Sequence, residues 1–568
     1  METLPVEILH RILDHLDTET ILFSIRPTCR LFRAIVNTYD RYTFDFKNIS
    51  KTNFHLFCRL IPSQNVTSLT LVGNEFMPNQ ICLFLSSIRL RQLTRLHSIT
   101  FHGIDELQLD MILKRINLSL ITSFSLTIKT YDNRRRKTTS HYISTILAQK
   151  HLHRLELDIN DDRLLCPSTC YIKQLVINGK ISFRKMYELL LCSPQLHTLI
   201  LKQDLYSTVD DALMKSSFPQ ITSLIIERLN LENDEIERFL MSMPSLTYLK
   251  LMGSHFVTDG NHLEDFLHVN LLRLNKFELL VNVPRSHNDF EMILDSFRTP
   301  FWIEHKKWFV AGEIDSRSSF NILLYTIPIC KSTLEYNPYV ENIFVCTSPI
   351  FEYASQMVIE NINELHLSLK TLGKSHFHDK VLERFNPLFP QITKLHIDFG
   401  SEFASDSIDL LHSIINISQL TEVKINKYYF NEKDRIPLCK LMEVLEKSPK
   451  LSSCLIYNRF CKYVMYPMLN DICTRIPRQI KHLQIPLNKL NQIEIILDRC
   501  PDLTFVQFDI SRLKFSTEVN QWFADNTIGS SSSRHNGCSM IWIGQRKNES
   551  SLNHKRIKLT DEHYNLEL

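Results

Sequence analysis

A short motif that recurs along most of this chain constrains its fold more than any other feature. In each copy an apolar residue is followed by two others, an apolar residue, one other and a further apolar residue, as in LTYLKL at 246–251. This alternation is that of a β-strand with one buried face. Within each of two blocks the copies recur every 20 to 31 residues, which is typical of a repeat array. The middle apolar positions are Leu69, Ile99, Phe124, Leu155, Leu175, Leu199, Leu224, Leu249 and Phe277, then, after a gap, Leu365, Leu395, Val423, Cys454, Leu483 and Val506.

Prolines mark the end of the segment between successive copies. Proline cannot continue a helix and favours extended geometry in the residue before it. The preceding segments are amphipathic at helical spacing, as Ile236, Phe239, Leu240 and Met243 illustrate. Strand and helix in alternation predict an α/β fold, a solenoid with a parallel sheet and outer helices. Six prolines stand two residues before the next strand's first apolar position: Pro194, Pro219, Pro244, Pro390, Pro449 and Pro501.

The first 45 residues follow a different, purely helical pattern. Leu4, Ile8, Leu9, Ile12 and Leu13 lie on one helical stripe. We expect two further short helices, one through residues 21–23 and one opening at Pro27. A unit of this size buries little core by itself. The stripe therefore packs either on the rest of this chain or on a second polypeptide, and spacing alone leaves both open.

The N-terminal pattern resembles an F-box in residue order and position, through LPVEIL at 4–9, the pairs 12–13 and 16–17, Leu22, and CRLFR at 29–33. Segments 192–196 and 499–503 are similar to the Cys-Pro-x-Leu repeats of F-box proteins of the leucine-rich-repeat class. The resemblance implies that residues 4–40 bind a Skp-type adaptor of a cullin–RING ubiquitin ligase complex, while the repeats hold an unknown protein substrate. The implied adaptor contacts are Leu4, Pro5, Ile8, Leu9, Ile12, Leu13, Leu22, Cys29 and Phe32.

Two departures from the F-box pattern stand out. Phe32 occupies a position where many relatives have tryptophan, and residues 26–28 replace an apolar lead into the third helix. The predicted organisation is an F-box at 1–46, a first leucine-rich-repeat-like block at 47–297, an atypical aromatic-rich insert at 298–355, a second block at 356–528 and a flexible C-terminal tail at 529–568. Within that tail a short strand is expected at 540–543.

The residue between the last two apolar positions of each strand should face the open side of the sheet. Most of these residues are polar, including His366 and His396, but Val176, Ile200 and Ile225 form an adjacent apolar group flanked by Glu156 and Lys250. An apolar patch with a charged rim is typical of a protein-binding site. We interpret it as the substrate-binding surface; the alternative is that the insert or the tail covers it.

Motifs that carry catalytic or metal chemistry are incomplete. Segment 373–375 lacks the second glycine of a phosphate-binding loop, and Cys166 with Cys170 lacks a second ligand pair at zinc spacing. The His376-x-His378 pair lacks the glutamate and helical spacing of a metalloprotease. No nucleophile-elbow motif occurs. We therefore expect a protein that is not an enzyme and needs no cofactor or metal.

Charge and hydropathy limit the remaining partners. The net charge is only +3, so nucleic acid is not an expected partner, and the basic runs at 134–137 and 555–558 favour solvated loops. No secretory pattern and no membrane-length apolar run is evident, and the 14 cysteines suit reduced thiols. The expected location is cytoplasmic and/or nuclear. The competing hypothesis is a ligase-independent scaffold whose N-terminal helices cap the solenoid.

Overall fold

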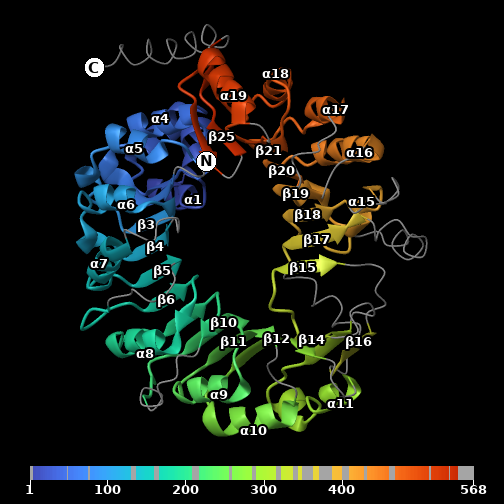
Figure 1. The fold of residues 1–568 in the computed structure, drawn as a ribbon. Helices are drawn as coiled ribbons and strands as arrows, with labels where there is room; N and C mark the ends of the chain where they lie inside the picture. Colours follow the sequence, from blue (N-terminus) through green and yellow to red (C-terminus); the bar gives the residue numbers. More distant parts are fainter. Residues whose placement is uncertain are drawn as a thin grey trace. The chain divides into compact units, whose positions relative to one another are not determined.

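The strands of the repeats form parallel sheets in chain order (Figure 1). Two compact units are present: Met1–Arg95 with His366–Pro387 and Ile392–Leu568, and Leu96–Leu365 with Leu388–Gln391. The computed structural model describes residues 4–47, 49–73, 77–128, 136–158, 166–206, 216–254, 259–284, 290–314, 321–336, 343–347, 362–369, 387–399, 408–427, 432–458, 467–510, 513–535 and 538–547.

The second unit contains one long run of parallel strands. Their order along the sheet is the order along the chain, as expected when each repeat packs on its neighbours. In Figure 1 helices α8, α9 and α10 lie along one side of these strands. The strands are β3 (Ser98–Ile104), β4 (Ser123–Ile128), β5 (Arg154–Asp158), β6 (Gln174–Ile177), β8 (Thr198–Leu201), β10 (Ser223–Leu229), β11 (Tyr248–Ser254) and β12 (Lys276–Pro284). The helices are α6 (Glu106–Leu113), α7 (Arg136–Leu147), α8 (Phe183–Cys192), α9 (Asn233–Met241), α10 (Gly260–Asn270) and α11 (Phe290–Asp295).

The first unit contains the N-terminal helices, the first two strands and the C-terminal repeats. Strand β17 (Glu364–Ser368) is the hydrogen-bonded neighbour of β18 (Lys394–Asp398). The strands of this unit are β1 (Tyr42–Asp45), β2 (Val66–Val72), β18 (Lys394–Asp398), β19 (Glu422–Lys427), β20 (Ser453–Asn458), β21 (His482–Pro486) and β22 (Phe505–Asp509). Its helices are α1 (Val6–Leu13), α2 (Thr18–Thr20), α3 (Arg30–Thr38), α4 (Lys51–Leu60), α5 (Gln80–Ser87), α15 (Leu411–Ile414), α16 (Arg435–Glu446), α17 (Pro467–Arg475), α18 (Asn491–Arg499) and α19 (Leu513–Asn526).

The middle apolar residues of the repeats form continuous rows. In the second unit Ile99 lies opposite Phe124, and the row continues strand by strand to Phe277. In the first unit a second row runs from Leu395 to Val506. The side chains of both rows are buried. The α/β class with parallel strands and repeated helices, predicted from spacing, is confirmed.

The helices end where the prolines predicted. Helix α8 stops at Cys192 before Pro194, and α18 stops at Arg499 before Pro501. Helices α9 and α16 end three residues before their prolines. None of the described helices has the length and apolar character needed to span a membrane.

The aromatic-rich segment extends the sheet of the second unit. Strands β13 (Val310–Ile314), β14 (Asn321–Thr326) and β16 (Ile343–Cys346) continue from β12 in antiparallel pairing. Trp302 and Trp308 are buried, and the ring of Trp308 lies 5.4 Å from that of Phe277 on β12. These aromatic rings pack into the core of the repeats, because burying their large apolar surface stabilises the fold.

Residues 529–547 differ from the flexible tail expected from the serine run. They contain β24 (Ser531–His535) and β25 (Cys538–Trp542), an antiparallel hairpin that pairs with β22 through β25. The hairpin is stabilised by the burial of two large apolar side chains, since Ile541 and Trp542 are fully buried. The strand expected at 540–543 thus forms, although it ends at Trp542. Residues 548–568 of the expected tail lie outside the described residues.

Candidate functional site

Helix α1 has one face in the protein core and one face exposed. Ile8 and Ile12 lie one helical turn apart and are 40% and 45% exposed. Apolar side chains before and after the helix and on α3 are similarly exposed. We call this set of exposed apolar side chains the N-terminal apolar surface: Leu4, Val6, Ile8, Ile12, Leu16 and Leu31.

The opposite face of α1 supplies a correction to the predicted adaptor contacts. Leu9, Leu13 and Leu22 are only 4–6% exposed, because they form the small core that the three helices share with the rest of the unit. These three leucines pack in the core below the N-terminal apolar surface and are not part of that surface. Sequence spacing placed Leu9 and Leu13 on the same stripe as Ile8 and Ile12, because the stripe is wider than the face that one neighbour can cover.

The third helix begins at Arg30 rather than at the predicted Pro27. Cys29 is its N-cap, and the Cys29 Sγ accepts a hydrogen bond from the Phe32 backbone N–H at 3.5 Å. Residues 26–28 form the turn before the helix. Cys29 and Pro5 are exposed and Phe32 is half-buried, so these three predicted contacts are accessible.

Polar contacts hold the N-terminal helices against the first strand. The Arg41 guanidinium donates two hydrogen bonds to the Asp14 carboxylate, at 2.9 and 3.1 Å, and this contact lowers the pKa of Asp14. The Tyr39 hydroxyl donates to Asp14 at 2.9 Å, and burial together with that bond raises the pKa of Tyr39. The Thr18 hydroxyl donates to the Thr43 carbonyl of β1 at 2.6 Å. These hydrogen bonds hold the helices that carry the N-terminal apolar surface against strand β1.

The predicted substrate row is continuous across five strands. Glu156 lies opposite Val176, then Ile200, Ile225 and Lys250 follow in register. Ile200 and Ile225 are half-buried, as accessible members of such a row would be.

Val176 corrects the expectation of an open patch, because it is only 2% exposed. The Lys202 ammonium, which follows β8, reaches across β6 to Glu156 on β5 at 3.4 Å, and Asn178 donates to the same carboxylate at 3.0 Å. The Lys202–Glu156 ion pair thus joins strand β5 to the end of β8, the two strands on either side of Val176. Burial alone would raise the pKa of Glu156, but the Asn178 hydrogen bond and the Lys202 charge lower it below its usual value.

The far end of the row is linked to the chain beyond β14. The Lys250 ammonium donates to the Cys330 carbonyl at 2.5 Å and lies 3.9 Å from the Glu278 carboxylate. The alternative expected from the sequence was that the insert or the tail covers this row. At Lys250 a residue of the insert, Cys330, does contact the row. The accessible apolar part of the row is reduced to Ile200 and Ile225.

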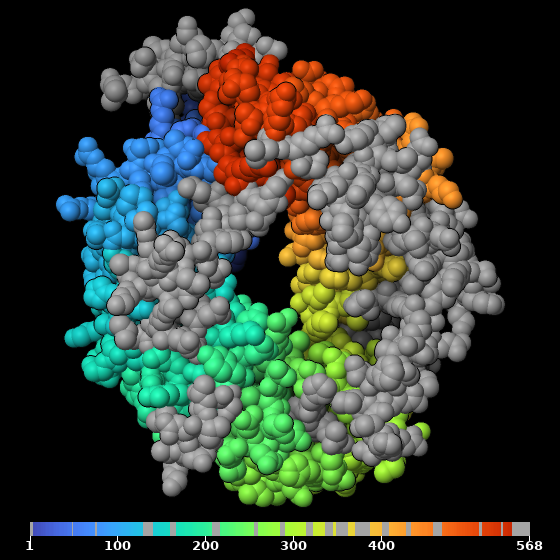
Figure 2. Space-filling model, in the orientation of Figure 1, coloured from blue at the N-terminus to red at the C-terminus, as the bar shows by residue number. Residues whose placement is uncertain are grey.

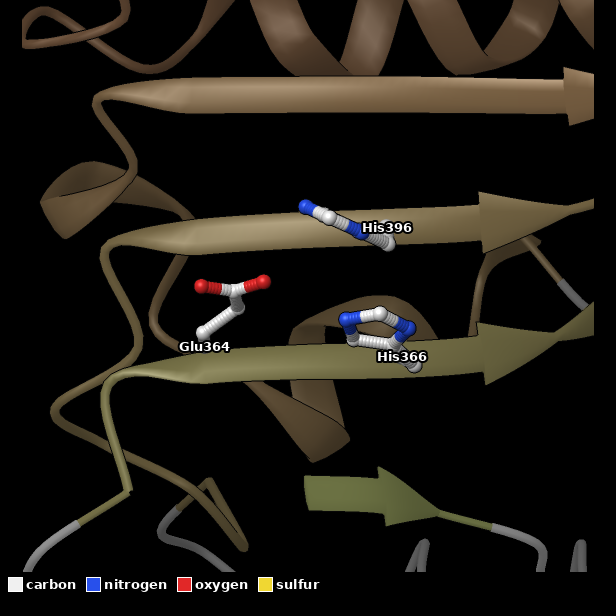
Figure 3. Close-up of side chains that lie close together, drawn as sticks. All are labelled: Glu364, His366 and His396. Atoms are coloured by element: carbon white, nitrogen blue, oxygen red, sulfur yellow. The ribbon is translucent and has the colours of Figure 1, made fainter. Parts of the chain in front are cut away.

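The structure brings together two groups of metal-ligand type that sequence spacing did not connect. Cys170 Sγ lies 3.4 Å from Cys192 Sγ, a residue absent from the Cys166–Cys170 pair considered in the sequence. Glu364, His366 and His396 gather on β17 and β18 (Figure 3). Segments 373–378, 134–135 and 555–558 lie outside the described residues, while Arg136 and Lys137 begin helix α7.

Comparison with known proteins identifies the N-terminal part. Residues 1–44 match the family model of the F-box domain. No curated protein matches the chain. Among solved structures, the leucine-rich repeat-containing protein LegL7 from Legionella pneumophila is similar at 14% identity, covering 76% of this chain and 95% of that one, with a TM-score of 0.16.

Repeated strand–helix units in register define a leucine-rich-repeat-like α/β protein with a helical domain before its first strand. That helical domain, residues 1–44, matches the F-box domain, and the repeats that follow it have a leucine-rich-repeat-like fold.

Proposed function

We propose that this chain is the substrate-recognition adaptor of a cullin–RING ubiquitin ligase. In this role the F-box binds a Skp-type adaptor, and the repeats bind the protein to be modified. The observation that carries the proposal is the N-terminal apolar surface, because it stands on the segment that matches the F-box domain.

The energetics of that surface favour a partner. Fully burying one leucine or isoleucine contributes about 1.5–3 kcal/mol. The six side chains of the N-terminal apolar surface are 36–45% exposed, so covering each of them completely would contribute roughly 1 kcal/mol. Grouped apolar exposure of this kind is typical of a protein interface.

The repeats supply the second binding surface. Ile200 and Ile225 remain accessible between Lys250 on one side and the Glu156–Lys202 pair on the other. We propose that this region contacts the recruited protein. The chain would then act by positioning: holding a target lysine near a ubiquitin-loaded enzyme raises its effective concentration without a catalytic group of its own. Cytoplasmic and/or nuclear location follows from this role.

A pull-down with a purified Skp-type adaptor tests the proposal. Ile8→Asp combined with Ile12→Asp places charge on the N-terminal apolar surface without entering the core, unlike a substitution at Leu9. The matched control is Leu107→Asp with Met111→Asp, which alters two exposed residues one turn apart on α6. We expect the wild type and the control to retain the adaptor, and the Ile8/Ile12 variant to lose at least about tenfold in affinity.

The same experiment decides the competing function. Burial of Leu9, Leu13 and Leu22 beneath the apolar surface is what a capping domain of a ligase-independent scaffold also requires. Failure of the folded wild-type chain to retain the adaptor would favour that scaffold. Equal retention by the Ile8/Ile12 variant and the control would remove the N-terminal apolar surface as the binding site.

A further inference from the structure

Three side chains of metal-ligand type converge on one side of neighbouring strands. Glu364 and His366 are two positions apart on β17, so the strand itself directs both to the same face. His396 stands on β18, the next strand in the sheet. Figure 3 shows the three side chains on the same side of these strands.

The donor atoms are close enough to share one ion. One ligand atom from each residue lies within 4.8 Å of the others. The two imidazole rings have centroids 4.1 Å apart at an interplanar angle of 34°. Zinc bonds of about 2.0–2.2 Å bring neighbouring donor atoms to roughly 3–4 Å of each other. Small side-chain rotations therefore suffice, and the half-buried setting of all three leaves room for them.

We propose that Glu364, His366 and His396 bind a divalent transition-metal ion, with Zn²⁺ as the best fit. Imidazole nitrogen suits zinc and its transition-metal neighbours, whereas Mg²⁺ and Ca²⁺ prefer sites made of oxygen. Two histidines and one carboxylate give three protein ligands, a set that leaves a coordination position for water or for a side chain of a bound protein.

The charges around the cluster are compatible with a cation. Lys424 on β19 lies opposite His396 in register, and its positive charge would oppose metal binding if it stood alone. Its ammonium lies 2.9 Å from the Glu422 carboxylate, which balances that charge. Within the described ranges this is the one group of three or more such residues with this spacing.

The metal site revises the expectation that the chain binds no metal. Sequence spacing shows Glu364-x-His366, but His396 is 30 residues further along and belongs to the next repeat. The two histidines occupy the same position in consecutive repeats, between the last two apolar residues of the strand. Parallel pairing in register then places them side by side.

Zinc binding to the purified full chain, freed of metal with a chelator, tests the proposal. A competition titration with a zinc-sensitive dye should give one site, and a tenfold excess of Mg²⁺ should not displace the ion. Glu364→Gln, His366→Ala and His396→Ala should each weaken zinc affinity by at least about tenfold, since even indirect partners of a ligand contribute that much. His197→Ala removes an exposed imidazole from the second unit and should leave the affinity unchanged.

Cobalt separates this site from the chain's 14 cysteines. Co²⁺ bound by histidine and carboxylate gives visible ligand-field bands without the strong near-ultraviolet charge transfer of thiolate ligation. We expect that histidine-type spectrum for the wild type and its loss in His366→Ala. A thiolate spectrum, or zinc affinity in Glu364→Gln and both histidine variants equal to that of His197→Ala, would overturn the proposal. The chain is tested without an adaptor, so the result is independent of ligase assembly.

Discussion

The carboxyl group of Asp509, the last residue of β22, is enclosed by neighbours from other strands. Its Oδ1 accepts a hydrogen bond from Gln484 Nε2 on β21 at 3.1 Å and one from Cys538 Sγ on β25 at 3.1 Å. Burial raises the pKa of Asp509, and these hydrogen bonds offset only part of that effect. A charged carboxylate at this position is therefore less favourable in the folded chain than in water.

Replacing Asp509 with asparagine should change how stability depends on pH. The folded-state pKa of Asp509 lies above the unfolded value of 3.8, so the protonated carboxyl group stabilises the fold. This contribution is complete below pH 3.8 and is lost as the pH rises through the folded-state pKa. Asparagine remains neutral and still offers Oδ1 as an acceptor. Relative to the wild type, Asp509→Asn should therefore gain stability between about pH 4 and pH 7. Urea-unfolding midpoints at both pH values measure this, and an equal difference at the two would contradict it.

At the scale of elements, each strand presents a buried row on one face and a partly solvated row on the other. Leu199 is fully buried, whereas Ile200, the next residue on β8, is only half-buried. The buried row holds the repeats together, whereas the half-buried row contains Ile200 and Ile225, which we propose as contacts for a recruited protein.

Charge placed on the half-buried row should affect binding more than folding. Ile200→Asp with Ile225→Asp should reduce co-purification of bound proteins, at a cost of about 1–2 kcal/mol in unfolding free energy for each change. Leu199→Ala, by contrast, should cost about 2–5 kcal/mol because it opens a cavity. Quantitative mass spectrometry of co-purified proteins and urea unfolding measure the two effects. An unchanged set of partners in the double variant would contradict the assignment of this row.

At the scale of the whole molecule, the first unit joins the two ends of the sequence. The Trp542 indole N–H donates to the Ile49 carbonyl at 2.9 Å, and the Trp542 ring lies 5.4 Å from that of Phe54 on α4. The Lys51 ammonium lies 5.2 Å above the indole ring and donates to the Ser531 hydroxyl. Figure 2 shows the N-terminal residues, in blue, beside the C-terminal segment, in red. The C-terminal hairpin thus packs against helix α4 and the segment just before it, which follow the F-box in the sequence.

Truncating this tryptophan should loosen residues almost 500 positions away. Trp542→Ala removes a fully buried ring and should lower stability by about 3–5 kcal/mol. Hydrogen exchange of the α4 amides should accelerate by at least about tenfold, because the helix loses a packing partner. The control is Trp522→Ala on α19, a half-buried residue that should have the smaller effect on α4. Unchanged α4 protection in Trp542→Ala would show that the two ends are not coupled.

The spacing of apolar residues and prolines along the sequence predicted the repeat strands and the ends of helices α8, α9, α16 and α18. Apolar spacing and proline placement act over a few residues, so the strands that contain Leu395, Val423 and Cys454 form where the spacing predicted them. The F-box was also evident, because its motif is short and contiguous. These features depend on local geometry, which a linear pattern encodes directly.

Packing between elements sets which apolar residues face outward and which side chains meet. Ile12 and Leu13 are equivalent in hydropathy, yet one is 45% exposed and the other 4%, because a neighbouring helix covers only part of the stripe. The cluster of Glu364 with His396 and the bond from Trp542 to Ile49 join residues 32 and 493 positions apart. Such contacts arise from packing between elements, and no spacing along the chain encodes them.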